Sequence, residues 1–295
     1  HPLVTALLDH REASKKVSTY GKKWTENVHP VTGRVHADWK QIGASTGRVS
    51  CAKPNLQNLP RDPGYRACFR PAEGRVLIKA DYAQIELRIV AEMAPDARMK
   101  QAFAEGKDLH ATTATHLLGK GEEEDVTSDE RQLAKAVNFG LIYGMGAKAL
   151  TKYARTNFGQ DLDESEAAGI RRRYFEAYPG IRIWQQIQGR ETETRTVLGR
   201  RRILDSDRHY TARLNSPVQG TGADGLKLAL VKMWESRDDI DAFPVLAIHD
   251  EIVVEAPAEK AREAKAWLVR CMREAMEEYL KEVPVVVEAE IKSTW

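Results

Sequence analysis

The chain has 295 residues, of which 42% are hydrophobic and 30% are charged, a balance typical of a soluble globular protein whose core is large enough for more than one lobe. The formal net charge of +2 neither requires nor excludes a polyanionic partner, and three widely spaced cysteines without a C-x-x-C pair argue against a disulfide framework or a zinc site. No apolar run approaches the roughly 18 residues of a membrane span, so we expect no membrane partner and a cytoplasmic location, in a bacterium or in the host of a virus, with an organelle as the alternative.

The first part of the chain predicts one helix followed by strands. Residues 3–20 have a helical pattern, whereas residues 29–64 are rich in Gly, Pro, Asn and Thr, which indicates short strands and turns. Residues 76–80 are β-rich, and at Asp81 the pattern becomes helical until near Pro95. We therefore expect a buried strand that ends where a helix begins.

The middle of the chain, residues 97–209, is predicted to be mainly helical. An acidic loop, GKGEEEDVTSDE, separates two of its helices. Thr127 or Ser128 is the expected N-cap of the second helix, with Glu130 close behind as in a capping box. The middle is therefore expected to form a helical insertion.

The last part of the chain returns to mixed structure. It predicts a helix over 216–237, a β-hairpin over 245–256, an amphipathic helix over 258–281 and a strand over 283–291. Because β-rich segments flank a helical middle, the predicted fold class is α+β, with one mixed lobe built from both ends of the chain and a helical lobe inserted between them.

Two carboxylates stand at predicted strand ends. Asp81 follows a buried strand, and Asp250 lies in the polar break His249-Asp250-Glu251 of the predicted hairpin, where a pair such as Asn-Gly is more usual. Mg2+ prefers oxygen ligands and often takes only one or two protein carboxylates together with phosphates. Carboxylates on neighbouring strands can hold two ions about 3.5–4 Å apart, as in-line phosphoryl displacement requires. The alternative is structural: Asp250 makes the turn and Asp81 caps the next helix.

The stretch RQLAKAVNFGLIYG predicts a helix with two cations followed by two aromatic rings along one slanting line. Four side chains spaced four residues apart form this line: Arg131, Lys135, Phe139 and Tyr143. Cations suit a triphosphate, and flat apolar rings suit its sugar and base. The alternative is a half-buried helix with core aromatics and solvated cations. Against it stand Gly140 and Gly144, each of which costs about 1 kcal/mol in a helix interior and so favours a close approach or a hinge.

These stretches together resemble the polymerase motifs of the family A (polymerase I-like) DNA polymerases. DYAQIELR is similar to motif A, RQLAKAVNFGLIYG to motif B, and HDE in an apolar hairpin to motif C. Further matches occur in the family's order: TGRVS, PNLQNLP, AFAEGKDLH and NSPVQGTGAD. The resemblance extends from about Thr19 to the C-terminus. It implies a right-hand polymerase fold, with an antiparallel-sheet palm and an inserted, mainly helical fingers subdomain.

The resemblance also implies a division of the chain into subdomains. These are a residual thumb base over 1–23, the first part of the palm over 24–90, the fingers over 91–205 and the second part of the palm over 206–295. The chain is short for the family and begins without a methionine, so we expect another chain or a missing N-terminal segment to supply thumb or nuclease functions. Many relatives carry an arginine where this chain has Thr211, and Arg213 is therefore left outside the predicted site.

The activity implied by the resemblance is that of a template-directed DNA polymerase. It would add dNTPs to a primer 3′-OH by two-metal-ion nucleotidyl transfer, without a proofreading domain in this chain. The implied partners are primer-template DNA and dNTPs, and the implied cofactor is a pair of Mg2+ ions, for which Mn2+ can substitute. The implied metal ligands are Asp81, Asp250 and the backbone carbonyl of Tyr82, and the implied catalytic residues are Asp81, Asp250 and Lys135, the last as general acid to pyrophosphate.

The remaining implied site residues contact the nucleotide or the DNA. Those for the dNTP are Gln84, Glu86, His110, Arg131, Lys135, Phe139 and Tyr143. Those for primer, template or the minor groove are Arg48, Asn55, Gln57, Asn215, Gln219 and His249. Glu86 would lie against C2′ of the sugar and exclude a ribose hydroxyl. Glu251 is expected to point to the opposite face of its strand from Asp250, with an indirect role at most.

Two other functions stay open at this point. A single-subunit RNA polymerase would share the hand and both aspartates, but Glu86 and Phe139 argue against it. A catalytically silent DNA-binding module is favoured by the short thumb and disfavoured by Lys135 and the two aspartates. Magnesium-dependent primer extension and competition between ribonucleotides and deoxyribonucleotides distinguish the three.

Overall fold

The structure, a computed structural model, describes residues 1–60, 62–121 and 125–295. Its centre is an antiparallel sheet of four strands in the order β6-β7-β3-β8. The bounds are β3 Arg75–Tyr82, β6 Phe243–Ile248, β7 Glu251–Pro257 and β8 Val287–Lys292. The sheet therefore joins a strand from early in the chain to three from its end, as the sequence predicted.

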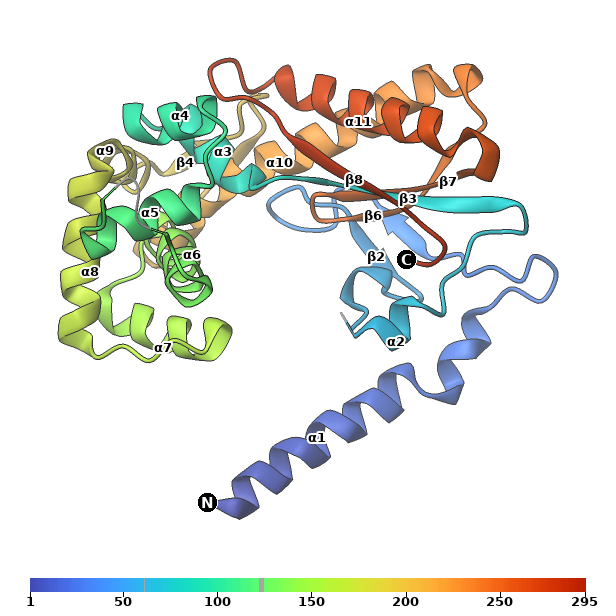
Figure 1. Ribbon diagram of the computed structural model, residues 1–295, viewed down its shortest axis with the longest axis horizontal. Coiled ribbons are helices and arrows are strands. Elements are labelled where there is room, and N and C mark those ends of the chain that lie inside the picture. The colour runs from blue at the N-terminus through green and yellow to red at the C-terminus, as the bar shows by residue number, and fades with distance from the viewer. Residues whose placement is uncertain (61, 122–124) are drawn as a thin grey trace.

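Two long helices, α10 and α11, cover one face of the sheet (Figure 1). Their bounds are Tyr210–Glu235 and Ala261–Glu277. Alternate side chains of β3 face this layer, and the phenol of Tyr82 donates to the carbonyl of Met272 at 2.7 Å. The other face carries Leu77 and packs against a smaller cluster that includes Trp295. The sheet is thus held from both sides.

The helical lobe lies to one side of the sheet (Figure 1). It contains α4 Ala97–Ala104, α5 Leu109–Leu118, α6 Ser128–Ile142, α7 Ala147–Phe158, α8 Glu164–Ala177 and α9 Pro179–Gln188. Helix α6 begins with the predicted capping box, because Thr127 accepts from the Glu130 backbone and the Glu130 carboxylate accepts from the Thr127 backbone. Residues 122–124 of the acidic loop lie outside the described residues.

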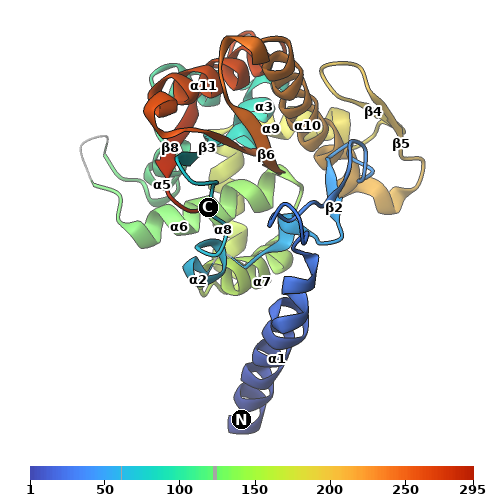
Figure 2. The same cartoon turned by 90° about the vertical axis from the view of Figure 1, so that its right-hand side faces the viewer.

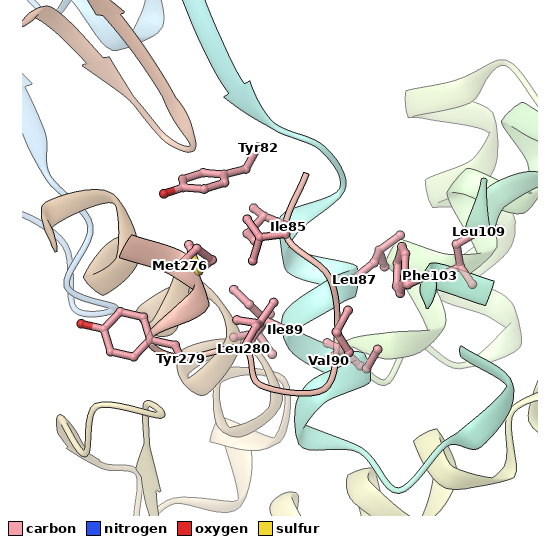
Figure 3. Packing of buried hydrophobic residues seen from close by; sticks show 14 of the residues in the cluster. Tyr82, Ile85, Leu87, Ile89, Val90, Phe103, Leu109, Met276, Tyr279 and Leu280 are labelled. Carbon is pink, nitrogen blue, oxygen red and sulfur yellow. The ribbon is translucent and has the colours of Figure 1, made fainter. Parts of the chain in front are cut away.

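Helix α3, Ile85–Met93, joins the sheet to the helical lobe. Figure 3 shows Ile89 directed toward Leu280, which follows α11, and Leu87 directed toward Phe103 of the helical lobe. All four side chains belong to one buried cluster. Because α3 is packed on both sides, the segment just after β3 is firmly fixed.

Shorter elements complete the fold. Two-stranded sheets form from β1 Asp38–Lys40 with β2 Ser50–Ala52 and from β4 Glu193–Arg195 with β5 Arg201–Ile203. The short helices are η1 Lys22–Asn27, η2 Leu56–Asn58, α2 Pro63–Arg66, η3 Asp207–His209, η4 Arg237–Asp239 and η5 Ala258–Lys260.

The first helix, α1, spans Pro2–Tyr20 and has no buried residue. Figures 1 and 2 show it extending away from the rest of the molecule. Within the ranges that the structure describes, no helix combines the length and the apolar character needed to cross a membrane.

The turn of the β6–β7 hairpin is shorter than predicted. It contains two residues, His249 and Asp250, whereas Glu251 already belongs to β7 and pairs with Asp81 and Ile248. His249 has φ 57°, a left-handed conformation that is uncommon outside glycine. A positive φ matches the twist of a two-residue hairpin turn, which explains how the chain reverses without an Asn-Gly pair.

Two further boundaries differ from the sequence prediction, and proline is involved in both. The strand predicted over 283–291 begins only at Val287, since Pro284 has no N–H for a strand ladder and its carbonyl accepts from Arg88. The helix predicted from residue 216 begins earlier, at the start of α10, with Pro217 inside it. Tertiary packing outweighs the proline signal there.

Buried Arg213 stabilises that additional helical stretch. Its guanidinium donates to the carbonyls of Leu204 at 2.9 and 3.0 Å and of Gly189 at 2.9 Å. These bonds use the Arg213 side chain inside the protein.

Candidate active site

The ends of β3 and of the β6–β7 hairpin bring Asp81 and Asp250 together. Asp81 pairs with Glu251 in the ladder, so its neighbour across the sheet is the residue next to Asp250. In addition, the Tyr82 backbone N–H donates to the Asp250 carbonyl at 3.3 Å. The charge of Asp81 contributes to the raised pKa of Asp250, as expected of neighbouring carboxylates. The sheet thus unites two acidic residues that lie far apart in sequence.

Asp81 does not cap the following helix, so the structural alternative considered for it is wrong. Helix α3 begins at Ile85, and its N-cap is Gln84, in a left-handed conformation and without a side-chain capping bond. The Asp81 Oδ1 atom is buried and has no hydrogen-bond partner in the described part of the chain. A buried carboxylate oxygen without a partner is costly unless a cation or a donor completes it.

The pKa values of Asp81 and Asp250 are both raised, mainly by burial and also by neighbouring negative charge. Burial raises the pKa of Asp250 to about 7, with a further contribution from the charge of Asp81. Burial also raises the pKa of Asp81, and the charge of Glu251 adds to the effect. A bound cation would relieve both the desolvation and the repulsion, so these residues fit a divalent-metal site.

The protein would supply only part of such a coordination shell. No cluster of three His, Cys, Asp or Glu side chains that could hold a metal occurs among the described residues. The Tyr82 phenol is buried and bonded to Met272, so at the strand end only the Tyr82 backbone is available. Two carboxylates and one backbone carbonyl leave coordination positions for phosphate oxygens and water, as is common for Mg2+.

A cleft of about 250 Å³ opens beside Asp250. Seven of its lining residues are predicted site residues: Arg48, Gln84, Glu86, Phe139, Gln219, His249 and Asp250. The others are Ile85, Gly222 and Ala223. A larger hollow of about 630 Å³ is lined by other residues, from α1, η1 and the segment 54–58, and of the predicted site it includes only Asn55. We take the smaller cleft as the candidate site, because Asp250 lines it and Asp81 lies close enough to Asp250 to raise its pKa beyond the effect of burial.

Glu86 is held by two donors in that cleft. Arg48 Nη2 donates to its Oε1 atom at 2.5 Å, and the Tyr143 hydroxyl donates to its Oε2 atom at 2.5 Å. Burial, followed by the negative charge of Glu86, raises the pKa of Tyr143 well above its ordinary value, so the phenol stays protonated as a donor. Glu86 is therefore a fixed carboxylate rather than a mobile surface residue.

Helices α5 and α6 carry the predicted phosphate-binding side chains. Arg131 donates through Nε at 2.7 Å and lies 2.6 Å from Asp108 through Nη2, with both contacts at the Asp108 Oδ2 atom. The Asp108 Oδ1 atom caps α5 by accepting the His110 backbone N–H at 2.8 Å. Asp108 is a functional candidate that sequence reasoning missed, although it lies in the AFAEGKDLH match.

His110 is buried and neutral, because burial lowers its pKa to about 4. Its Nδ1 atom lies 3.0 Å from the Asn138 side-chain amide nitrogen, which can only donate. His110 therefore carries its proton on Nε2 and can donate from that atom. The charge of Lys135 also acts on His110, and the Phe139 ring centroid lies 5.9 Å from that of the imidazole. His110, Lys135 and Phe139 are therefore neighbours across α5 and α6.

Other predicted residues are used partly inside the protein. Gln57 donates to the carbonyls of Val49 at 3.3 Å and Ala247 at 3.0 Å. Asn55 accepts the Gln57 backbone N–H at 3.0 Å and so caps η2. Asn215 Oδ1 is buried, with no hydrogen-bond partner among the residues described. Of these three, only Asn215 has an unused acceptor facing the interior.

Glu251 lies on the sheet face that carries Asp81, because directly paired residues share a face. Its carboxylate accepts from Trp295 Nε1 at 3.0 Å and forms an ion pair with Lys79 at 3.1 Å. The Glu251 carboxylate is therefore already partnered by Trp295 and Lys79 within the protein.

Comparison with known proteins identifies the fold and the family. The sequence model of DNA polymerase family A matches residues 1–295. The chain is 44% identical over 289 residues to DNA polymerase I of Aquifex aeolicus, covering 95% of this chain and 49% of the relative. It is 38% identical over 312 residues to the thermostable DNA polymerase I of Thermus aquaticus, covering 100% of this chain and 36% of that relative.

A solved structure agrees with these relatives. The POL domain of Pol1 from M. smegmatis, in complex with DNA primer-template and dNTP, has a TM-score of 0.90 and 31% identity, covering 100% of this chain and 53% of that one. The fold is thus the predicted α+β right-hand polymerase fold. The chain spans about half the length, or less, of the curated relatives described above. On these matches, the chain belongs to DNA polymerase family A.

Proposed function

We propose that this protein is a template-directed DNA polymerase that adds dNTPs to a primer 3′-OH. The observation that carries the proposal is that sheet pairing brings Asp81 next to Asp250, which lines a cleft together with Glu86 and Phe139. Membership in DNA polymerase family A, and the primer-template DNA and dNTP in the similar Pol1 structure, support the same reaction.

The cofactor of this reaction is a pair of Mg2+ ions, for which Mn2+ can substitute. Asp81, Asp250 and the backbone carbonyl of Tyr82 would hold them. When bound, such ions stabilise the attacking and the leaving oxygens of the displacement. The unpartnered Asp81 Oδ1 atom and the raised pKa of Asp250 support this assignment.

Side chains of α5 and α6 bind the triphosphate. Arg131 and Lys135 supply positive charge, and His110 donates from Nε2. Lys135 is also the general acid that gives a proton to the departing pyrophosphate. Phe139 packs against the sugar in the cleft, which fits its place in the lining.

Glu86 controls the sugar side of the cleft. Since Arg48 and Tyr143 hold both oxygens of Glu86, its carboxylate cannot move away from a ribose 2′-hydroxyl without breaking a bond. Ribonucleotides would therefore be excluded by steric conflict. Tyr143 borders the pocket of the template base.

The fingers are proposed to close by rotation near Gly144, just after α6. Gly144 has φ +82°, and a Cβ atom there would lie 2.5 Å from the Tyr210 ring, so both conformation and space require glycine. Closure would move Arg131 and Lys135 toward the palm and remove water from the reacting groups.

Primer-template DNA is the proposed macromolecular partner. Its contacts are Arg48, Asn55, Gln57, Asn215, Gln219 and His249. In the minor groove, hydrogen-bond acceptors are nearly the same for every correct pair, so such contacts test pairing geometry rather than sequence. We also propose the subdomain division given above, with the palm interrupted by fingers over 91–205.

Primer extension tests this function. A labelled primer on a longer template is incubated with each dNTP or each rNTP singly, in Mg2+ and in EDTA. We expect extension only with Mg2+ and only by the nucleotide complementary to the template. Failure to extend in Mg2+ while duplex DNA is still bound would identify the silent DNA-binding module, and a preference for ribonucleotides would identify an RNA polymerase.

A further inference from the structure

A buried carboxylate in α10, Asp224, has no part in the mechanism above. Asp224 is 4% exposed. Its Oδ1 atom lies 3.1 Å from Arg200 Nη2 and 3.3 Å from Lys227 Nζ, so two cations share one oxygen. The Oδ2 atom is buried and has no hydrogen-bond partner among the described residues. Removing this carboxylate would leave Arg200 and Lys227 close together without a counter-charge, which is costly at a buried position.

Both cations also hold the same loop. Arg200 Nη1 donates to the Thr46 carbonyl at 2.8 Å, and Lys227 Nζ donates to the Gly47 carbonyl at 3.2 Å. These are consecutive carbonyls. A Cβ atom at Gly47, where φ is +85°, would lie 2.0 Å from the Arg200 guanidinium, so this residue is glycine because the arginine needs its space.

The loop that they hold carries Arg48. The backbone N–H groups of Gly43 and Ala44 both donate to the Arg48 carbonyl, at 3.0 and 3.2 Å, and Gly47 N–H donates to the Ala44 carbonyl at 2.8 Å. Residues 43–48 therefore form a closed turn, and the carbonyls of Thr46 and Gly47 in this turn accept from the two cations. Its final side chain, Arg48, reaches Glu86 in the cleft.

We propose that Asp224 is a positioning residue that acts through Arg200 and Lys227 to fix the 43–48 loop, and thereby sets how Arg48 holds Glu86. The proposal rests on the proposed function, because it assigns Asp224 to sugar selection by Glu86. Without the Asp224 charge the two cations repel each other, and the loop loses the donors to Thr46 and Gly47.

The first test does not depend on activity. Hydrogen exchange of the Gly43, Ala44 and Gly47 amides is compared between wild type and Asp224→Asn, and we expect an increase of roughly tenfold. The matched control is Glu255→Gln, because Glu255 is also buried, at 1% exposed, and also holds two cations, at 2.8 and 3.3 Å in β7. Equal exchange in wild type and Asp224→Asn would overturn the proposal.

The second test uses the preference for dNTP over rNTP in primer extension. Asp224→Asn and Lys227→Met, which removes one of the two cations, should each lower this preference, by about fivefold, in the wild-type background and not in an Arg48→Ala background. Glu255→Gln should leave the preference unchanged. Additive effects of Asp224→Asn and Arg48→Ala would overturn the proposal, since they would show that Asp224 acts independently of Arg48.

The two tests separate this inference from the proposed function. If wild type extends primers but the Asp224 effects are absent, only the inference fails. If wild type does not extend primers, the proposed function fails, and the hydrogen-exchange comparison still decides whether Asp224 fixes the loop.

Discussion

The backbone N–H of Tyr82 donates to the carbonyl oxygen of Asp250 at 3.3 Å, which ties the end of β3 to the turn of the β6–β7 hairpin. The two acidic side chains are therefore mounted on one sheet rather than on independent loops. Their spacing is set by backbone pairing, and replacing either carboxylate should change the chemistry more than the fold.

Asp250→Ala tests this separation of chemistry and fold. We expect primer extension to fall by about 10³-fold or more, because one of two metal carboxylates is lost, while affinity for duplex DNA stays near that of wild type. Asp241→Asn is the control, since Asp241 is an exposed carboxylate paired with Arg75. Extension rates and DNA dissociation constants are measured for all three proteins. Full activity in Asp250→Ala would remove this residue from the metal site.

The raised pKa of Asp250, about 7, predicts a pH-dependent stability in EDTA. Because the folded state holds this proton to a higher pH than the unfolded state, the linked stabilisation is complete below the ordinary pKa of 3.8 and is lost as the pH rises through about 7. Asp250→Asn replaces this carboxyl group with a neutral amide that does not ionise. Relative to wild type, the variant should therefore gain free energy of unfolding between pH 4 and 8, by up to roughly 4 kcal/mol.

Urea unfolding at several pH values measures this gain. A stability difference between wild type and Asp250→Asn that does not change with pH would contradict the raised pKa. Adding Mg2+ at pH 8 should stabilise wild type and not the variant, because only the wild-type pair of carboxylates can bind the ion.

Glu86→Ala should relax sugar discrimination, because the side chain proposed to meet a ribose 2′-hydroxyl is removed. Tyr143→Phe removes only one of the two bonds to Glu86, so its preference for dNTP over rNTP should fall less, by about threefold to tenfold. Single-nucleotide incorporation with matched dNTP and rNTP measures both. Unchanged rejection of ribonucleotides in Glu86→Ala would contradict the assignment of this residue as the steric barrier.

Local signals in the sequence predicted much of the fold and several of the residues that the structure brings together at the candidate site. The capping box of Thr127 and Glu130 has a short-range signature, and so does the four-residue spacing that puts Arg131 and Lys135 on one helix face. Asp81 and Asp250 were identifiable because charged residues at the ends of buried strands are unusual. Each of these features depends on residues within a few positions of one another.

The features that sequence reasoning missed depend on contacts between distant segments. Asp108 is a common kind of N-cap, and its bond to Arg131 depends on how α5 packs on α6. Asp224 has no distinguishing signal in its own helix, because its partner Arg200 comes from a segment 24 residues earlier in the chain. The two-residue hairpin turn also had no local signal, because it relies on a left-handed His249.

Asp108→Asn tests whether the missed contact matters for nucleotide binding. The amide keeps an oxygen to cap α5 but loses the negative charge that fixes Arg131. Arg131 should then sample more conformations, and the KM for dNTP should rise by roughly tenfold with a smaller change in kcat, since a charge-assisted bond contributes about 1.5–3 kcal/mol. Steady-state extension with varied dNTP concentration measures both constants.

Asp163→Asn is the matched control for this prediction. Asp163 caps α8 in the same way, by accepting the Glu166 backbone N–H at 2.7 Å, and lies outside the proposed site. Its variant should leave the KM unchanged. A lower KM in Asp108→Asn would reverse the interpretation, because it would mean that Asp108 competes with the triphosphate for Arg131 instead of orienting the guanidinium toward it.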